Sequence, residues 1–312
     1  MRKLFSLILL LAMVFLLAGC DNPPPVHIEL NTDFKAPTTL EDGEGRKVKV
    51  ILLLGQSNAT GCALNSYLET NVGEERYSVY ESGFSNIWIN YSVDNENNSS
   101  NGEFVKTAVG CGHIKDWFGP ELGIAEKLSR EYPDETFVIL KYTYSGSCLA
   151  TQWLDGRERG QLHDAAVKFA STYMDALLSH NYDASIGAIC WMQGESDAIG
   201  TIAGNYYKNQ SRFVSYLRND LDKYADDGGI YFIDAGIQDN DIFPKYETVN
   251  RAKERFAERS DMNLYFSTID AGLTTLFEPE ENPDIAHYDS MSTLKLGHLF
   301  GEQIIYAYSK SR

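Results

Sequence analysis

Positive charge is scarce in this chain. Its 312 residues contain 27 Lys and Arg against 44 Asp and Glu, which gives a formal net charge of −17. So acidic a protein is poorly suited to bind nucleic acid or to adhere to an anionic surface, and we expect neither partner. The chain has no internal repeat, and 43% of its residues are hydrophobic. That content is enough for one sizeable core, and it favours one large α/β domain over two small ones.

A long membrane-spanning segment is also lacking at the N-terminus. The apolar run Leu4–Leu17 is too short to cross a bilayer comfortably, and it follows the basic residues Arg2 and Lys3. The next residues, Leu-Ala-Gly-Cys20, resemble a bacterial lipobox, in which cleavage before the cysteine precedes its lipid modification. The alternatives are an ordinary secretory signal and an uncleaved anchor.

The lipobox predicts a division of the chain into three parts. Residues 1–19 are expected to be a signal peptide, and residues 20–45 a lipidated cysteine with a flexible, Pro-rich tether. Residues 46–312 then form the folded domain. Loss of the signal takes the formal charge to −19, because it removes Arg2 and Lys3. These features predict a lipid-anchored protein of the bacterial cell envelope, with the choice of inner or outer membrane left open.

Cysteine is rare, with five residues in the chain. Apart from Cys20 they are Cys62, Cys111, Cys148 and Cys190. Four cysteines allow three complete pairings, and the sequence does not choose among them. Export permits a disulfide, and we expect one bridge, between Cys62 and Cys111. Cys190 lies in an apolar run and is expected to be a core residue.

Apolar strand-like runs alternate with amphipathic segments along the domain. The patterns predict strands over 48–54, 136–144, 185–192, 229–235 and 263–269, helices over 120–131, 163–178, 206–224, 249–258 and 291–308, and a loop over 90–102. Such alternation is typical of parallel βαβ units with helices on both faces of the sheet. Ser57, Gly146 and Gln193 each follow a predicted strand, so we expect all three on one rim of the sheet.

Histidine is scarce as well, with six residues. His287 differs from the others because it lies in a loop three residues after Asp284. An acid at that spacing can turn back onto the imidazole and fix its tautomer, as a serine hydrolase requires. Ser57 comes two residues after Gly55, where the apolar strand run ends, and a hydroxyl there is well placed to act as a nucleophile. The pattern therefore predicts serine-dependent ester chemistry.

Five motifs occur in order along the chain: Gly-Gln-Ser57-Asn, Gly-Pro-Glu121-Leu, Gly146-Ser-Cys-Leu, Trp-Met-Gln193-Gly-Glu-Ser-Asp-Ala and Asp284-x-x-His287. With these motifs the chain resembles the SGNH-hydrolase superfamily, in the branch of sialate O-acetylesterases and acetyl xylan esterases. The resemblance implies a three-layer α/β/α sandwich with a mostly parallel, flavodoxin-like sheet. It also implies removal of O-acetyl groups from carbohydrates, with no cofactor and no metal.

The resemblance assigns a role to each matching position. Ser57 would be the nucleophile, His287 the base and Asp284 its orienting acid. The backbone N–H groups of Ser57 and Gly146 and the side-chain amide of Gln193 would hold the oxyanion. Substrate-contacting positions would include Gln56, Asn58 and Trp153, although Asn58 could instead bond neighbouring loops and Trp153 could be a core residue.

Two features of the sequence leave alternatives open. Glu195 competes with Asp284 for the orienting role, and its other interpretation is a buried carboxylate that bonds loop backbone. Met192 replaces a histidine found in some acetyl xylan esterases, which brings the chain closer to the sialate esterases. The competing functions are an esterase for lipid or aryl esters, disfavoured because no long apolar insertion lies near the site, and an inactive sugar-binding lipoprotein. The sugar and the oligomeric state stay open.

Overall fold

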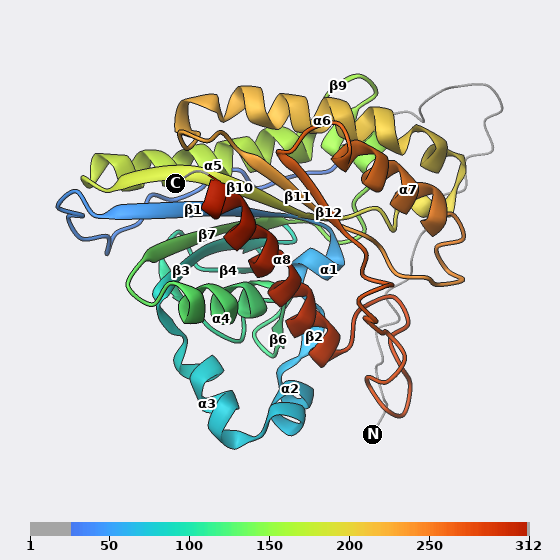
Figure 1. Ribbon diagram of the computed structural model, residues 1–312, viewed down its shortest axis with the longest axis horizontal. Helices are drawn as coiled ribbons and strands as arrows, with labels where there is room; N and C mark the ends of the chain where they lie inside the picture. Colours follow the sequence, from blue (N-terminus) through green and yellow to red (C-terminus); the bar gives the residue numbers. More distant parts are fainter. Residues whose placement is uncertain (1–25, 311–312) are drawn as a thin grey trace.

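A computed structural model describes residues 26–310 of the chain as an α/β domain built on one large sheet (Figure 1). The sheet order is β12-β11-β10-β1-β7-β3-β4, and β5 also pairs with β3. The strands from β12 through β3 run parallel to their neighbours, whereas β4 and β5 are antiparallel to β3. In sheet order the strands are Asn263–Phe266 (β12), Tyr231–Ala235 (β11), Asp183–Met192 (β10), Lys47–Gly55 (β1), Thr136–Thr143 (β7), Phe84–Val93 (β3), Asn98–Ser99 (β4) and Val105–Thr107 (β5).

Helices cover both faces of this sheet. The α5, α6 and α7 helices lie on one face, and α4 and α8 pack together on the other (Figure 1). The helices are Ser57–Thr60 (α1), Asn65–Val72 (α2), Glu74–Ser82 (α3), Glu121–Glu131 (α4), Gln161–Ser179 (α5), Tyr206–Asp220 (α6), Tyr246–Ala257 (α7) and Ser290–Lys310 (α8). The predicted three-layer α/β/α fold, with its mostly parallel sheet, is confirmed.

Short elements complete the chain. Two small ribbons pair β2 (Ala63–Leu64) with β6 (Trp117–Phe118) and β8 (Leu154–Asp155) with β9 (Glu158–Arg159). A π-helical turn covers Leu149–Trp153, and 3₁₀ turns cover Asp197–Ile199, Thr201–Asn205 and Asp222–Tyr224.

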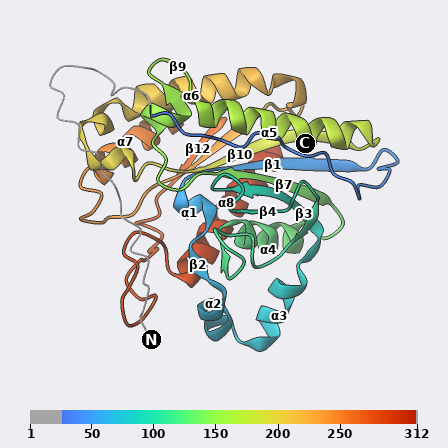
Figure 2. The same ribbon diagram turned by 180° about the vertical axis from the view of Figure 1, so that it is seen from behind.

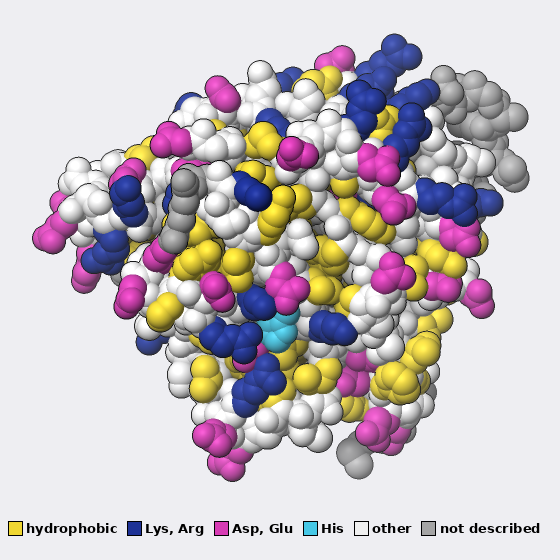
Figure 3. Space-filling model, viewed as in Figure 1, with side chains coloured by type: hydrophobic (Ala, Val, Ile, Leu, Met, Phe, Trp, Pro, Cys, Tyr) yellow, Lys and Arg dark blue, Asp and Glu magenta, His cyan; other side chains and the backbone are white. Residues whose placement is uncertain are grey.

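On the face covered by α4 and α8, acidic and basic side chains are intermingled (Figure 3).

The central strand β1 sets the position of the reactive rim. Its apolar run is buried on both sides, as expected of an inner strand in a parallel sheet. At its tip, Gly55 lies opposite Met192 of β10 and Thr143 of β7. A side chain at Gly55 would meet the Met192 carbonyl at 2.0 Å, so glycine allows this close approach. The three strands therefore end together, which confirms that Ser57, Gly146 and Gln193 share one rim.

The N-terminal segment departs from the expected flexible tether. Residues 26–45 lie extended against the domain and run along α5 (Figure 2), and we call them the strap. Gln161 of α5 bonds the backbone of Ile28, and Tyr173 bonds the carbonyl of Lys35. Phe34 packs edge-to-face on a ring of α5, that of Phe169, at 5.2 Å. Contacts with residues distant in the sequence thus hold the strap in place, although its own sequence has no helical or strand periodicity.

The predicted loop over 90–102 is partly wrong, because its first residues belong to β3. Asn90 is buried there, and its amide donates to the Gly102 carbonyl at 2.8 Å. An amide whose nitrogen finds a carbonyl partner can occupy a strand next to the sheet edge, so the polar composition gave a wrong prediction. The helices α2 and α3 were not expected either.

The predicted signal peptide and the lipidated Cys20 lie outside the described residues. Within 26–310, no helix is both long and apolar enough to cross a bilayer.

Candidate active site

Ser57 lies at the tip of β1 as the first residue of the one-turn helix α1. Its carbonyl accepts the N–H of Gly61 at 2.8 Å, which closes this turn. The far end of α1 is held by Lys141, whose ammonium donates to the Thr60 carbonyl at 2.8 Å and to Glu121 at 2.6 Å. Both charged side chains are fully buried and paired. The serine therefore sits on a turn held by buried contacts, and Ser57 itself is 8% exposed.

His287 and Asp284 form a pair in the loop before α8. The imidazole Nδ1 lies 2.7 Å from Asp284 Oδ2. Burial opposes a charge on His287, but the nearby Cys62 thiol and the Asp284 carboxylate outweigh it, and they hold the pKa of His287 well above its ordinary value. Burial likewise favours the neutral form of Asp284, but its hydrogen bond with His287 lowers the pKa of this carboxyl. The pair thus has the geometry of a base with its orienting acid.

Asn58 connects the serine turn to the histidine loop. Its amide oxygen accepts the N–H of Tyr288 at 3.1 Å, and its amide nitrogen contacts the Ala286 carbonyl at 3.4 Å. These two residues flank His287, and Asn58 directly follows Ser57. The Cys62 thiol forms a second connection, because it donates to the Ser57 carbonyl at 3.6 Å and interacts with His287. These links join the turn of Ser57 to the loop of His287, although the two residues are 230 positions apart.

Glu195 is bonded to the same Asn58 amide, and among the described residues it forms no hydrogen bond with the imidazole. Its side chain is fully buried and accepts the amide of Asn58 at 2.7 Å. Burial raises the pKa of Glu195, and the hydrogen bond from Asn58 opposes that rise. Of the two competing acids, the structure places Asp284 against His287 and places Glu195 under Asn58.

Gly146 forms the opposite wall of the site. It follows β7 in a turn closed by a hydrogen bond from Ser147 N–H to the Tyr144 carbonyl at 3.3 Å. Its φ of +67° suits glycine, and a Cβ there would point into open space. In residues 26–310 no hydrogen bond uses the backbone N–H of Ser57 or Gly146. Two donors are thus free to receive an oxyanion.

Gln193 does not offer the third donor expected of it. Its amide nitrogen donates to Asp197 at 2.7 Å and to the Ser147 carbonyl at 3.0 Å. It also donates to the Gln56 amide oxygen at 3.2 Å, so neither amide hydrogen is left unbonded, and the side chain is fully buried. Asp197 also accepts the backbone N–H of Leu149 at 2.8 Å. Gln193 therefore fixes the loops of the rim from below, and the prediction that it donates to the oxyanion is corrected.

The three expected substrate contacts also lie below the surface. Gln56 is buried against the loop that begins at Gln193. Trp153 is fully buried, packs edge-to-face on Trp191 at 4.9 Å and donates its indole N–H to Ser147 at 2.9 Å. Asn58 uses its side chain for the connection between loops described above. These residues shape the site from beneath, and none of them presents a face to a sugar.

The expected disulfide is absent, because Cys62, Cys111, Cys148 and Cys190 are all free thiols. Cys62 faces the Ser57 carbonyl and His287. Cys111 is buried elsewhere, and burial raises the pKa of its thiol to about 11. The two sulfur atoms thus lie in different surroundings. Cys190 is buried in β10, as expected of a core residue.

One group on this rim was not found from the sequence. The carboxylate of Asp94 accepts both the backbone N–H and the hydroxyl of Ser145, the residue before Gly146. The same carboxylate bonds Nδ1 of His113. These residues are 19 to 51 positions apart, so no local spacing could have indicated the cluster. The turn of left-handed residues at 94–96 is its one sequence signal, a run of Asp, Asn and Glu.

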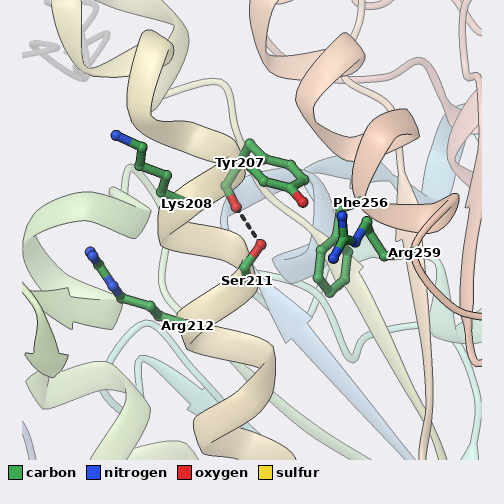
Figure 4. A pocket seen from close by; sticks show the side chains of 6 residues that line it. All are labelled: Tyr207, Lys208, Ser211, Arg212, Phe256 and Arg259. Atoms are coloured by element: carbon green, nitrogen blue, oxygen red, sulfur yellow. Dashed lines mark hydrogen bonds between the residues drawn. The ribbon is translucent and has the colours of Figure 1, made fainter.

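A separate depression lies between α6 and α7, away from the serine. It is lined by Tyr207, Lys208, Ser211, Arg212, Phe256 and Arg259, and the hydroxyl of Ser211 donates to the carbonyl of Tyr207 at 2.7 Å (Figure 4). None of these residues belongs to the rim. Over the described range there is also no group of three or more His, Cys, Asp or Glu side chains arranged to hold a metal ion.

Comparisons with known proteins give related folds and a family. No curated protein sequence matches the chain. Its fold is similar to that of an Arabidopsis thaliana protein, with 16% identity over 83% of this chain and 98% of the other and a TM-score of 0.62. It is also similar to that of NanS, with 17% identity over 86% and 99% and a TM-score of 0.62. A carbohydrate acetylesterase from Xanthomonas citri shares 14% identity over 84% and 57%, with a TM-score of 0.55.

The family model described as "Carbohydrate esterase, sialic acid-specific acetylesterase" matches residues 47–306. This range contains the whole sheet and every residue of the site. The resemblance drawn from the five motifs is therefore confirmed, and the protein is a carboxylic ester hydrolase. The chain belongs to the sialic acid-specific acetylesterase family of carbohydrate esterases.

Proposed function

We propose that this protein removes O-acetyl groups from carbohydrates through an acetyl-serine intermediate formed on Ser57. His287 accepts the hydroxyl proton as Ser57 attacks the acetyl carbonyl, and it then delivers that proton to the departing sugar hydroxyl. Asp284 keeps the imidazole in the tautomer that leaves Nε2 free for this transfer. The backbone N–H groups of Ser57 and Gly146 stabilise the oxyanion. A water molecule, activated by His287 in turn, cleaves the acetyl-serine to acetate.

The observation that carries this proposal is the link between two distant loops. Asn58, next to Ser57, holds the residues on both sides of His287, while Asp284 lies 2.7 Å from the imidazole. This link and this pair support a nucleophile, a base and an acid that act together at the rim, where a Cβ at Gly146 would point into open space. The family match supports a carbohydrate acetate ester as the substrate.

Acetate release tests the proposal. The purified domain should release acetate from at least one of three substrate classes, namely O-acetyl sialic acid, acetylated xylan and acetylated pectin fragments, and it should also cleave p-nitrophenyl acetate. Ser57→Ala should abolish both activities. Ser211→Ala, on the outer side of α6, is the matched control and should retain them. An S57A variant that turns over at the wild-type rate would exclude Ser57 as the nucleophile.

We also propose that Cys20 carries a lipid that anchors the enzyme in the bacterial cell envelope. The support is the lipobox-like sequence that ends at this cysteine. Cells supplied with radiolabelled palmitate should yield a labelled protein that partitions into the detergent phase. Cys20→Ala should lose the label, whereas Cys148→Ala should keep it. A labelled C20A variant would contradict the assignment.

A further inference from the structure

A second aspartate–histidine pair stands beside the oxyanion wall. Asp94 binds Nδ1 of His113 with one carboxylate oxygen, and with its two oxygens it also binds the backbone and the hydroxyl of Ser145. Ser145 precedes Gly146, so this carboxylate and the oxyanion donor share one turn. On its other side, the backbone N–H of His113 donates to the Gly61 carbonyl at 2.9 Å, and Gly61 closes the turn of Ser57. The pair is therefore tied to both walls of the reactive site.

The imidazole of His113 is fixed at one end and open at the other. Its Nδ1 is taken by Asp94, and its backbone carbonyl accepts the amide of Asn97 at 2.7 Å. Among the residues that the structure describes, none forms a hydrogen bond with Nε2, and 28% of the side chain is exposed. In the neutral ring, an Nδ1–H that faces a carboxylate leaves a lone pair on Nε2. This nitrogen can accept a hydrogen bond from a hydroxyl group.

The backbone that presents Asp94 is unusual. Asp94, Asn95 and Glu96 have φ angles of +49°, +61° and +67°, and none of them is glycine. Three consecutive left-handed residues cost free energy, and such strain tends to occur at functional sites. The strap supports this turn, because Asn31 bonds the side chains of Asn95 and Glu96. The fold thus holds the turn in place by contacts from a distant segment.

An aromatic ring lies next to the open imidazole. The ring of Trp117 is 5.5 Å from that of His113, at an interplanar angle of 37°, and it is half-buried. A pyranose ring has one face of C–H groups that can pack on an indole, and hydroxyl groups around its edge. An aromatic surface with a fixed acceptor beside it suits both features.

We propose that His113 and Trp117, oriented by Asp94, form the subsite for the sugar that carries the acetyl ester. This inference rests on the proposed function. With the acetyl group between Ser57 and Gly146, the sugar would extend along the Ser145 turn toward His113. Its C–H face would pack on Trp117, and a hydroxyl would donate to His113 Nε2. His113 would therefore determine affinity for the sugar, while Ser57 and His287 perform the chemistry.

Kinetics with two kinds of ester tests the subsite. We expect His113→Ala to lower kcat/KM on the best acetylated sugar by about 10- to 100-fold more than on p-nitrophenyl acetate, which has no sugar, mainly by raising KM. The matched control is His298→Ala. This histidine also bonds a carboxylate, Glu126, and its side chain is 27% exposed, but it lies on α8. H298A should keep the wild-type ratio. Equal losses on both esters would make His113 a structural residue and overturn the proposal, as would wild-type kcat/KM on both.

Binding without turnover separates this inference from the proposed function. In the Ser57→Ala background, calorimetry with O-acetyl sialic acid and acetylated xylo-oligosaccharides measures sugar affinity alone. Addition of H113A should weaken binding about tenfold or more, and Trp117→Ala should act in the same direction. Unchanged affinity would overturn the subsite even if the wild-type enzyme releases acetate. Conversely, sugar binding that depends on His113 in a protein that releases no acetate would sustain the subsite and refute the esterase.

Discussion

Two aspartate–histidine pairs lie on the same rim of the sheet, and the fold assembles them differently. Asp284 and His287 are three residues apart in one loop, with 47% and 21% of their side chains exposed. Asp94 and His113 are 19 residues apart, on a turn after β3 and a loop before β6, and Asp94 is only 10% exposed. The side chains of Asn58 and Cys62 connect the loop of the first pair to the turn of Ser57, and the second pair holds Ser145, next to Gly146. In the roles proposed above, the first pair transfers protons, and the second positions the Gly146 turn and the sugar.

The strongest test of this comparison removes each histidine. His287→Ala should lower kcat on p-nitrophenyl acetate by about 10⁴-fold or more, because Ser57 then has no base. His113→Ala should have a far smaller effect on the same ester, because it lies outside the proton path. Steady-state kinetics of both variants measures the difference. Comparable losses in the two variants would erase the distinction between the pairs.

The acid of the first pair gives the next largest effect. Asp284→Asn should lower kcat by about 10³- to 10⁴-fold, because the amide no longer stabilises the imidazolium or fixes the tautomer. Glu195→Gln should cost under about tenfold, since the new amide oxygen can still accept the hydrogen bond from Asn58. If Glu195→Gln shows the larger loss in kcat, the orienting role belongs to Glu195.

The acid of the second pair should act through the oxyanion turn. We expect Asp94→Asn to lower kcat by about tenfold on both sugar acetates and p-nitrophenyl acetate, because the charge that holds the Ser145 N–H and hydroxyl is lost. Asparagine tolerates the left-handed backbone of position 94, so the fold should persist. Circular dichroism checks the fold. An effect confined to sugar substrates would limit Asp94 to the sugar subsite.

The smallest effect concerns pH. The neutral form of His287 is the base, so kcat/KM should rise with pH through the raised pKa of this group, at a midpoint above about 6.5. Cys62 contributes to the raised pKa, and Cys62→Ala should therefore move the midpoint downward. A pH–rate profile of p-nitrophenyl acetate hydrolysis measures both midpoints. A midpoint in C62A equal to or above that of the wild type would show that the thiol does not act on His287.

The sequence predicted the sheet and the Asp284–His287 pair because both depend on short-range patterns. Buried parallel strands are continuous apolar runs, and their common ends place Ser57, Gly146 and Gln193 on one rim. The direction of a polar side chain, in contrast, depends on contacts between residues far apart in the sequence. Gln193 faces inward because its amide nitrogen donates to both Asp197 and the Ser147 carbonyl. These partners lie on loops that only folding brings together.

The same reason explains what was missed. The strap is held by Gln161 and Tyr173, which lie more than a hundred residues away. Its own sequence therefore predicts a linker. Asn90 reads as a loop residue because its partner, the Gly102 carbonyl, becomes available only in the folded sheet. Pairing across such separations leaves no periodicity in the chain.

The strap would also limit the reach of an enzyme anchored by a lipid on Cys20. At its start, the backbone N–H of Val26 donates to the Thr151 carbonyl at 3.2 Å, in the turn that follows the Gly146 loop. If Cys20 carries a lipid, the chain between it and Val26 spans at most roughly 20 Å when fully extended. The catalytic rim would then work within a thin layer above the bilayer. Acetylated chains would have to come to the membrane, because the enzyme could not travel outward to meet them.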